Sequence, residues 1–337
     1  MTCIAAARVR ALVGLLASFA IAACMPSPTV HEIAGESMGT TWSVRYVAHD
    51  PVDMSGALQA ELDAVTAQMS TWEPTSAISG FNASPAGSVH ALPEGFRTVL
   101  DAALALARET DGAYDPTVGP LVNLWGFGPD GARSEPPPAR DIDAVRERVG
   151  FQRLRLEDDR LRQPGGVYVD LSSIAKGYAV DRMAAAVEAA GLTDYLVEAG
   201  GELRARGHRP DGKRWRVAIE RPDADGAAIQ EIVELADVAI ATSGDYRAYF
   251  ESGGRRYSHT IDPRTGAPVQ HGLVSVTVLD PACMRADALA TALTVLGPDA
   301  GSAFAEMHGI AALFIEDRGG RLIERTTPAW DARVPVR

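Results

Sequence analysis

Cysteine is scarce in this 337-residue chain, which contains only Cys3, Cys24 and Cys283. Cys3 and Cys24 lie in an N-terminal segment that has the features of an export signal, so Cys283 is the one cysteine in the rest of the chain. A single cysteine can form neither an intrachain disulfide nor a cluster of Cys and His metal ligands. Stability must therefore come from a hydrophobic core, and 46% hydrophobic residues in a chain of this length are enough to build one.

Positive charge is also limited, because 32 Lys and Arg face 44 Asp and Glu, a formal net charge of −12. Such an acidic protein is not expected to bind nucleic acid, and a phosphate-bearing ligand would need a metal ion or a locally basic pocket. Lysine is the rarest cation, with Lys176 and Lys213 alone. Lys176 lies in a glycine-flanked motif where its compact charge could serve a ligand, and chance placement is the alternative.

The N-terminal segment combines positive charge, an apolar run and a cysteine. Arg8 and Arg10 precede the acid-free stretch 11–20, which is short for a membrane span. The box Ile21-Ala22-Ala23-Cys24 is that of a lipoprotein signal peptide, with Ile in place of the usual Leu. An ordinary signal peptide with an incidental cysteine is the alternative.

We therefore predict a lipoprotein signal peptide at residues 1–23, a lipidated cysteine and tether at 24–30, and one domain at 31–337. Lipidation of Cys24 would anchor the exported protein to the cell membrane, at the periplasmic side of the inner membrane. Met25 is not the acidic residue that commonly retains a lipoprotein in the inner membrane, so sorting between two membranes stays open.

Hydrophobic periodicity and turn residues predict a mixture of helices and strands. Helical spacing marks residues 58–69, 93–110, 174–190, 286–296 and 299–308. Strand patterns mark 30–48 with a break at Met38-Gly39, a strand ending at Val169, residues 195–198, much of 214–278, and a closing strand at 310–315. Residues 128–140 have the Pro and Gly content of an exposed loop. We predict an α/β fold of mixed α+β character, as one compact domain or two interleaved lobes.

Four glycine-containing clusters mix carboxylates or hydroxyls with residues that let a ligand approach the backbone. They are 36–42, 111–119, 170–179, and the pair 258–266 with 285–292. In the third, a predicted strand passes through small residues into a helix whose N-terminal N–H groups suit phosphate. Its glycine-to-lysine spacing is not that of a Walker A loop. The alternative is a helix capped by Asp170 or Ser172.

In the last cluster, Asp287 and Thr291 are four residues apart on a predicted helix, so both side-chain oxygens lie on one face. A carboxylate, a hydroxyl and a backbone carbonyl are hard oxygen ligands. Mg²⁺ takes few such ligands from a protein and keeps water or substrate phosphate in its other positions. The alternative is an Asp that favours the helix dipole and a Thr bonded to its own helix.

His259 lies between a predicted strand and an Asp-Pro turn. With an unperturbed pKa of about 6.5 it could act as a general base, with Asp262 as its orienting partner, or it could support the turn. Met38 and Trp72 could flank a planar ring, although such residues at strand ends more often belong to a core.

Together these clusters resemble the ApbE family, the FAD:protein FMN transferases. The resemblance extends from about residue 33 to the C-terminal strand. It rests on Asp-Leu-Ser-Ser-Ile-Ala-Lys-Gly-Tyr-Ala, His-Thr-Ile-Asp-Pro-Arg-Thr-Gly and Ala-Asp-Ala-Leu-Ala-Thr-Ala, in the order of the family. Many members are exported lipoproteins, in agreement with Cys24. Ser172-Ser173 stands where many members have Gly or Ala, a change that a backbone ligand tolerates.

The resemblance implies a set of ligand-binding residues. The matched metal ligands for Mg²⁺ are the backbone oxygen of Ser173 and the side chains of Asp287 and Thr291. The matched FAD-binding positions are Met38, Trp72, Ala113, Tyr114, Asp115, Asp170, Lys176 and Ile261.

It also implies a reaction, in which a threonine hydroxyl of an acceptor protein attacks the FMN-side phosphorus of FAD and AMP leaves. His259 is the candidate catalytic base. Acceptors would be flavin-carrying redox proteins, including subunits of membrane ion-pumping complexes. Two alternatives use the same residues: an FAD pyrophosphatase, in which water replaces the threonine, and a non-catalytic lipoprotein that carries FAD. The metal ligands and His259 argue against a carrier, since a carrier needs no activated pyrophosphate.

Overall fold

The computed structural model describes residues 27–222, 228–244 and 248–334. The predicted signal peptide, Cys24 and the first part of the tether lie outside the described residues. Within them, no helix combines the length and the apolar character needed to cross a membrane.

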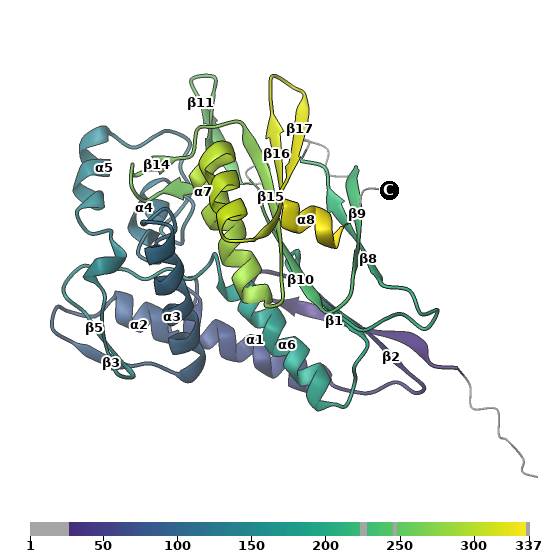
Figure 1. Cartoon of the computed structure of the whole chain (residues 1–337). Helices are drawn as coiled ribbons and strands as arrows, with labels where there is room; N and C mark the ends of the chain where they lie inside the picture. Colours follow the sequence, from purple (N-terminus) through teal and green to yellow (C-terminus); the bar gives the residue numbers. More distant parts are fainter. Residues whose placement is uncertain (1–26, 223–227, 245–247, 335–337) are drawn as a thin grey trace, which may run out of the picture.

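An eight-stranded sheet forms the centre of the fold (Figure 1). Its order is β1-β2-β6-β7-β10-β15-β16-β17, and every neighbouring pair is antiparallel. Its strands are β1 (Thr29–Ser37), β2 (Thr40–Ala48), β6 (Tyr195–Ala199), β7 (Glu202–Arg206), β10 (Val238–Gly244), β15 (Leu273–Asp280), β16 (Ala311–Asp317) and β17 (Leu322–Thr326). Because β2 pairs with β6, the first residues of the described chain share one sheet with its last third.

Helices cover one face of this sheet, as Figure 1 shows. They are α1 (Ser55–Met69), α6 (Ala175–Ala189) and α7 (Cys283–Met307), with α3 (Glu94–Glu109) packed against α1 and α7. α1 buries Leu58, Leu62, Val65 and Met69, which recur at the spacing of one helix face. These side chains meet alternate residues of the strands in the main hydrophobic core.

A separate hairpin and a short helix cover the opposite face. β8 (Trp215–Glu220) pairs with β9 (Ile229–Leu235) in a two-stranded sheet, and α8 (Pro328–Arg333) follows β17. β8 alternates strictly and buries Trp215, Val217 and Ile219. With Trp330 of α8 and residues of the main sheet, these side chains form a second core.

Short elements complete the molecule, and a small third core around Leu121, Trp125 and Ile261 joins several of them. β3, β5 and β4 form a three-stranded sheet, while β11–β12 and β13–β14 are small hairpins. The bounds are α2 (Ala77–Asn82), β3 (Val89–Ala91), α4 (Gly119–Leu124), α5 (Ala139–Arg146), the 3-10 helix η1 (Phe151–Arg153), β4 (Arg155–Glu157), β5 (Arg160–Arg162), β11 (Tyr249–Ser252), β12 (Arg255–Ser258), β13 (Ile261–Asp262) and β14 (Ala267–Pro268).

The predicted mixture of helices and strands is confirmed, and the antiparallel sheet gives it the α+β form. The break at Met38-Gly39 is the β1–β2 turn, where the two residues have φ of 54° and 72°. The two helices predicted at 286–296 and 299–308 are halves of α7. They are separated at Gly297, with φ of 81°, and at Pro298, which cannot continue a helix without a break.

Two strand predictions are wrong. Residues up to Val169 form no strand, because the Asn82 side-chain amide takes both hydrogen bonds of the Val169 backbone, at 2.7 and 2.9 Å. Gln163 does the same for the N–H of Val167 at 3.1 Å. Side-chain amides thus replace a neighbouring strand, which apolar patterning cannot reveal. The strand predicted to close the chain is β16, but β17 and α8 follow it.

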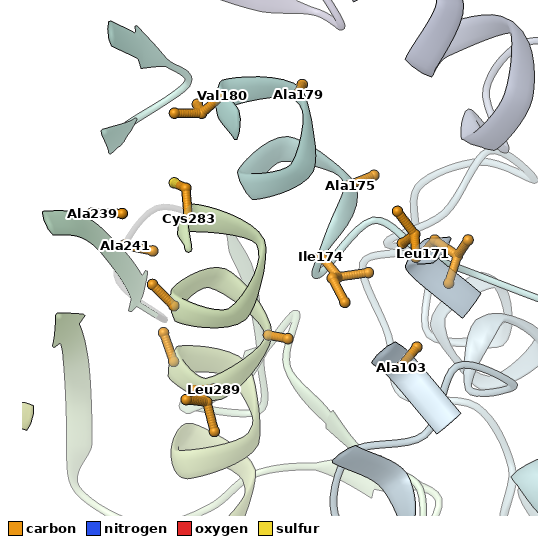
Figure 2. Close-up of a cluster of buried hydrophobic side chains, with 14 of the residues drawn as sticks. Ala103, Leu171, Ile174, Ala175, Ala179, Val180, Ala239, Ala241, Cys283 and Leu289 are labelled. Carbon is orange, nitrogen blue, oxygen red and sulfur yellow. The ribbon is translucent and has the colours of Figure 1, made fainter. Parts of the chain in front are cut away.

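Helices α6 and α7 approach each other closely at Gly177 of α6. Figure 2 shows Cys283 at the start of α7, in the main core beside α6. A Cβ atom on Gly177 would lie 2.4 Å from the carbonyl oxygen of Cys283 and 2.8 Å from Cβ of Asp287. Glycine is therefore required where the two helices touch.

Candidate active site

A cavity of about 700 Å³ is lined by the start of α6, the middle of α7, the β6–β7 turn, β8 and the segment around His259. It brings together predicted site residues from five separate parts of the chain. Of those within the described residues, all except Met38 line it: Trp72, Ala113, Tyr114, Asp115, Asp170, Ser173, Lys176, His259, Ile261, Asp287 and Thr291.

Lys176 is held by a carboxylate that the sequence analysis did not identify. Its Nζ lies 2.8 and 3.0 Å from the two carboxylate oxygens of Glu202, a buried residue that follows the left-handed Gly200-Gly201 turn. Burial and the charge of Asp287 raise the pKa of Glu202, and Lys176 opposes that rise. Burial lowers the pKa of Lys176, but the two carboxylates outweigh it and the net pKa is raised. The ammonium therefore stays charged at neutral pH.

Asp287 is buried on the first turns of α7. Its Oδ2 accepts a hydrogen bond of 2.9 Å from the backbone N–H of Gly177, so α6 and α7 position it together. Burial raises the pKa of the carboxyl, and the Lys176 charge and the Gly177 bond offset only part of the rise. Two carboxyl groups buried around one ammonium disfavour each other's ionised form, and a bound cation would stabilise both as carboxylates.

A second contact fixes the start of α7 against α6. The carboxylate of Asp181 accepts hydrogen bonds from the N–H groups of Cys283, at 3.1 Å, and Met284, at 2.9 Å. It also pairs with Arg204 of β7. Since Asp287 follows one turn later, this cap sets where its carboxylate lies.

The backbone oxygen of Ser173 lacks its usual helical partner. In a regular helix the Gly177 N–H would bond to the carbonyl four residues before it, which is that of Ser173. It bonds to Asp287 instead, and no hydrogen bond among the described residues ends on the Ser173 carbonyl. This oxygen is free to accept a ligand at the cavity wall.

Thr291 is also free of its own helix. Thr294, three residues later, donates its hydroxyl to the Ala290 carbonyl at 2.8 Å, but Thr291 makes no such bond within the described chain. The Ser173 carbonyl, the Asp287 carboxylate and the Thr291 hydroxyl are therefore hard oxygen donors at one cavity, as Mg²⁺ requires. No three His, Cys, Asp or Glu side chains gather as a metal site in the part of the chain that the structure describes. The residues fit a magnesium ion that takes one carboxylate from the protein.

Tyr114 and Asp115 differ in what they offer a ligand. The Ser173 hydroxyl donates to the Tyr114 hydroxyl at 3.0 Å, and burial raises the pKa of this phenol above its usual range. The Asp115 carboxylate accepts from the N–H and hydroxyl of Thr117, at 2.8 and 2.6 Å, and from the Phe151 N–H at 2.8 Å. Burial raises the pKa of Asp115 against these bonds. Asp115 thus shapes the loop at the cavity, while Tyr114 presents a neutral hydroxyl.

Asp170 shapes a turn and does not cap the helix that follows. Its Oδ1 accepts a hydrogen bond of 2.9 Å from the Ser172 N–H, and its own N–H donates to the Pro116 carbonyl at 2.8 Å. α6 begins at Ala175 without a side-chain cap. The alternative of a simple helix cap by Asp170 or Ser172 is therefore not what the structure shows.

Trp72 and Met38 lie differently with respect to the cavity. Trp72 is at the cavity wall with 65% of its surface exposed, which leaves an aromatic face available to a planar ligand. Met38 lies in the β1–β2 turn, packs against the main core and does not line the cavity. This turn is nearby, since a Cβ on Gly200 would lie 3.0 Å from Thr40 and 3.4 Å from Lys176. A flavin between Met38 and Trp72 stays a prediction.

His259 follows β12 and lines the cavity. Its Nδ1 lies 3.2 Å from the carbonyl oxygen of Ala248, and its ring meets Phe127 edge-on with centroids 6.3 Å apart. When Nδ1 carries the hydrogen and donates to that carbonyl, Nε2 has the lone pair that a base needs. Burial lowers the pKa of His259, the Ala248 bond opposes this, and the charge of Lys176 lowers it further. The ring is therefore neutral near pH 7.

The prediction that Asp262 orients His259 is wrong. Both carboxylate oxygens of Asp262 bond to the guanidinium of Arg264, each at 2.9 Å. Asp262 also accepts from the Arg264 N–H at 2.9 Å, so the Asp-Pro turn folds this carboxylate back onto its own loop. The backbone carbonyl of Ala248, which no side-chain pattern marks, takes its place.

The described part of the cavity wall carries more acidic than basic side chains. Among the described residues, five acidic side chains line it, against three basic ones: Asp115, Asp170, Glu202, Glu220 and Asp287, against Arg45, Lys176 and Arg216. A pyrophosphate would be repelled by this excess unless a cation bound with it. The charge balance therefore supports the same conclusion as the three oxygen donors, that a cation binds at this cavity together with the pyrophosphate.

Comparison with protein families identifies the pattern. The model described as "ApbE family" matches residues 38–314. An FAD:protein FMN transferase of Vibrio cholerae is 45% identical over 310 residues, which are 90% of this chain and 92% of that protein. The FAD:protein FMN transferase of Haemophilus influenzae is 37% identical, over 95% of this chain and 96% of the other.

A solved structure shows the same arrangement. The apo form of the Pseudomonas stutzeri flavinyl transferase ApbE superposes with a TM-score of 0.85 at 44% identity, covering 92% of this chain and 98% of that one. The sheet and the helices that carry the cavity therefore belong to a fold already seen in flavin transferases.

Proposed function

This chain belongs to the ApbE family, and we propose that it transfers FMN from FAD to a threonine of an acceptor flavoprotein, with release of AMP. It is a transferase that acts on FAD, as are relatives up to 45% identical over nearly its whole length. One observation carries the proposal: a single cavity joins every FAD-matched residue except Met38, three hard oxygen donors and a neutral histidine. A protein that only carried FAD would not need a base at the same cavity.

FAD would bind along the matched wall, with its flavin near Trp72 and its adenine end near Ile261. Tyr114 would donate or accept a hydrogen bond through its neutral hydroxyl, because its raised pKa keeps it protonated. Lys176 would face the phosphates with a charge held in place by Glu202. These placements follow the family resemblance and the cavity lining.

Mg²⁺ would be held by the Ser173 carbonyl, the Asp287 carboxylate and the Thr291 hydroxyl. When bound, it supplies positive charge that neutralises the pyrophosphate oxygens as charge develops on them. The free Ser173 carbonyl and the buried Asp287 support this placement.

In the reaction, the threonine Oγ forms a bond to the FMN-side phosphorus, and the bond from that phosphorus to the bridging oxygen breaks. The bridging oxygen leaves with its electron pair as part of AMP. His259 accepts the hydroxyl proton at Nε2, while the Ala248 carbonyl holds the ring through Nδ1. The lowered pKa of His259 keeps Nε2 free to accept this proton near pH 7.

The acceptor and the location of the protein are further parts of the proposal. Flavin-carrying redox proteins, including subunits of membrane ion-pumping complexes, are the acceptors that the family resemblance suggests. A lipid on Cys24 would hold the transferase at the periplasmic side of the membrane, close to such acceptors. Membrane fractionation and analysis of the mature N-terminus test the anchor: the wild type should remain with the membrane, and Cys24→Ala should not be processed in the lipoprotein manner.

Product analysis tests the proposed reaction. The protein is incubated with FAD, Mg²⁺ and a purified redox flavoprotein, and the nucleotides are separated by chromatography. A transferase releases AMP in an amount equal to the FMN that becomes covalently bound. A pyrophosphatase releases AMP together with free FMN, and a carrier leaves FAD intact. Free FMN with an unmodified acceptor would replace the transfer proposal by hydrolysis.

A further inference from the structure

One part of the cavity wall contains none of the residues matched to FAD or to the metal. It consists of Leu196, Leu203 and Ile240 of the main sheet and residues 216–220 of β8. The apolar residues among these belong to the second core or pack against it, on the sheet face opposite the helices. The cavity therefore continues past the β6–β7 turn to the hairpin β8–β9. We call this part the β8 limb.

The lining of the β8 limb shows how β8 meets the cavity. Side chains alternate between the two faces of a strand, so a cavity against one face touches every second residue. Here five consecutive residues, from Arg216 to Glu220, line the cavity. Such a run indicates that the cavity lies along the edge of the strand. Within the described ranges, β9 is the only strand that pairs with β8, and it occupies the other edge.

The pairing of β8 with β9 shows which backbone groups face the cavity. The Arg221 N–H donates to the Ala228 carbonyl, so Arg221 points its backbone groups toward β9. The register shift lies on the β9 side, because Ile219 pairs with Glu231 and Glu220 with Ile229. The alternation along β8 is therefore unbroken, and the N–H and C=O of Ala218 point to the edge that faces the cavity.

We propose that the acceptor segment carrying the target threonine binds in extended form as an added strand beside Ala218, on the edge of β8 that faces the cavity. This inference rests on the proposed function, which requires a protein segment to reach the phosphates beside Lys176. The β8 limb leads there directly, because Leu203 follows Glu202, the partner of Lys176. Backbone pairing needs no particular acceptor side chain, and Leu196 and Ile240 offer an apolar floor for alternate residues.

The first test changes the acceptor and leaves the enzyme intact. The modified threonine of a redox flavoprotein that the wild type flavinylates is located by mass spectrometry, and a peptide spanning it is synthesised. Backbone N–H groups of the peptide are then N-methylated one at a time. Methylation of every second amide should raise KM about 3–10-fold, because each removes one backbone hydrogen bond to β8. Methylation of the amides between them should have little effect. A flat profile along the peptide contradicts the added strand.

The second test places proline at two matched positions of the hairpin. Ala218 pairs with Ile232, and by the same alternation the Ile232 backbone faces away from β8, outside the cavity lining. Ala218→Pro removes an N–H from the cavity edge, and Ile232→Pro removes one from the outer edge. The two variants should lower the unfolding temperature to a similar extent. Only Ala218→Pro should raise KM for the acceptor peptide, by about 10-fold or more.

The outcomes separate this proposal from the proposed function. A wild type that modifies no acceptor in the presence of FAD and Mg²⁺ would overturn both. A wild type that flavinylates the unmethylated peptide, with equal KM for both proline variants, would overturn the β8 edge and leave FMN transfer standing. An equal rise in KM for the acceptor peptide in both proline variants would assign the effect to hairpin stability, and it would also overturn the binding of the acceptor at the β8 edge.

Discussion

Two walls of the same cavity are built in different ways. The α6–α7 wall carries Lys176, Asp287 and Thr291 on two long helices that are part of the main core, with Ser173 just before α6. The histidine wall carries His259 on a connection between two very short strands, beside a cluster of stacked rings. In this cluster Phe250 and Tyr257 have centroids 5.0 Å apart.

The difference lies in how many bonds fix each functional group. On the α6–α7 wall, Asp287 is held by the Gly177 N–H and Lys176 by both oxygens of Glu202. On the histidine wall, a single ring nitrogen of His259 meets one backbone carbonyl. Substitutions in the first wall should therefore change folding and chemistry together, while those in the second should change chemistry more than folding.

The largest expected effect is that of Asp287→Ala on the α6–α7 wall. Loss of the only carboxylate among the three oxygen donors should reduce Mg²⁺-dependent turnover of FAD on the order of 10³-fold, because a bound metal supplies several kcal/mol to the transition state. Steady-state turnover at saturating FAD and Mg²⁺ measures it. Asp287→Asn is the matched control, since it keeps an acceptor for Gly177 N–H and loses the charge. Turnover at the wild-type rate in either variant would refute the metal assignment.

His259→Ala should lower kcat by ~10²–10⁴-fold, the usual contribution of a general base, with little change in the KM for FAD. Its stability should fall by only about 0.5–1.5 kcal/mol, because the hydrogen bond to Ala248 and the edge-on contact with Phe127 are lost. Kinetics and chemical unfolding of the same preparation measure both quantities. Unchanged kcat for both transfer and hydrolysis would remove His259 from catalysis.

The pH profile of kcat/KM sharpens the histidine prediction. Burial lowers the pKa of His259, so the neutral base persists below the ordinary histidine pKa of about 6.5. Activity should therefore fall on the acid side only below that pH, and this limb should be absent from the residual activity of His259→Ala. Stability depends on pH with the same sign. Between the lowered pKa of His259 in the folded state and its ordinary pKa in the unfolded state, the unfolded chain binds more protons, so acidification destabilises the fold. An acid limb above pH of about 7 would contradict the lowered pKa.

Gly177→Ala tests the packing of the α6–α7 wall. The added methyl would meet the Cys283 carbonyl at 2.4 Å, so we expect about 1–3 kcal/mol of destabilisation from overpacking, together with lower activity as Asp287 shifts. Gly80→Ala in α2 is the control, because a Cβ there meets nothing within 4 Å and alanine favours a helix. Denaturant unfolding compares the two. Equal stability of the two variants would show that the helix contact is not tight.

The smallest expected effect is that of Trp72→Ala at the cavity wall. A mostly exposed indole contributes little to the fold, so unfolding should change by less than about 0.5 kcal/mol. Loss of aromatic stacking on the flavin should raise the Kd for FAD about 3–10-fold. Titration of FAD, followed by its fluorescence, measures this. An unchanged Kd would place the flavin elsewhere, and Trp72→Phe should retain most of the affinity.

The sequence predicts the α6–α7 wall well for a physical reason. Asp287 and Thr291 are brought to one face by helix geometry alone. The helices predicted at 58–69, 93–110 and 174–190 correspond to α1, α3 and α6, since their apolar spacing continues over several turns.

The parts that sequence reasoning missed depend on contacts between distant segments. Glu202 stands 26 residues after Lys176, and only the Gly200-Gly201 turn at the start of its strand hinted at a special position. The Ala248 carbonyl has no side-chain signature at all. The wrongly predicted strand at Val169 is held by Asn82, which is 87 residues earlier in the chain. Patterns of local periodicity cannot contain such pairs.

We infer that the two walls act on one transfer, the first on the phosphates and the second on the attacking hydroxyl. The most direct test is the intact mass of an acceptor flavoprotein after incubation with FAD, Mg²⁺ and wild type, Asp287→Asn or His259→Ala. We expect the wild type to add one FMN and both variants to leave the acceptor at its starting mass over the same time. An acceptor that stays unmodified while the wild type consumes FAD, or one modified equally by either variant, would contradict the account.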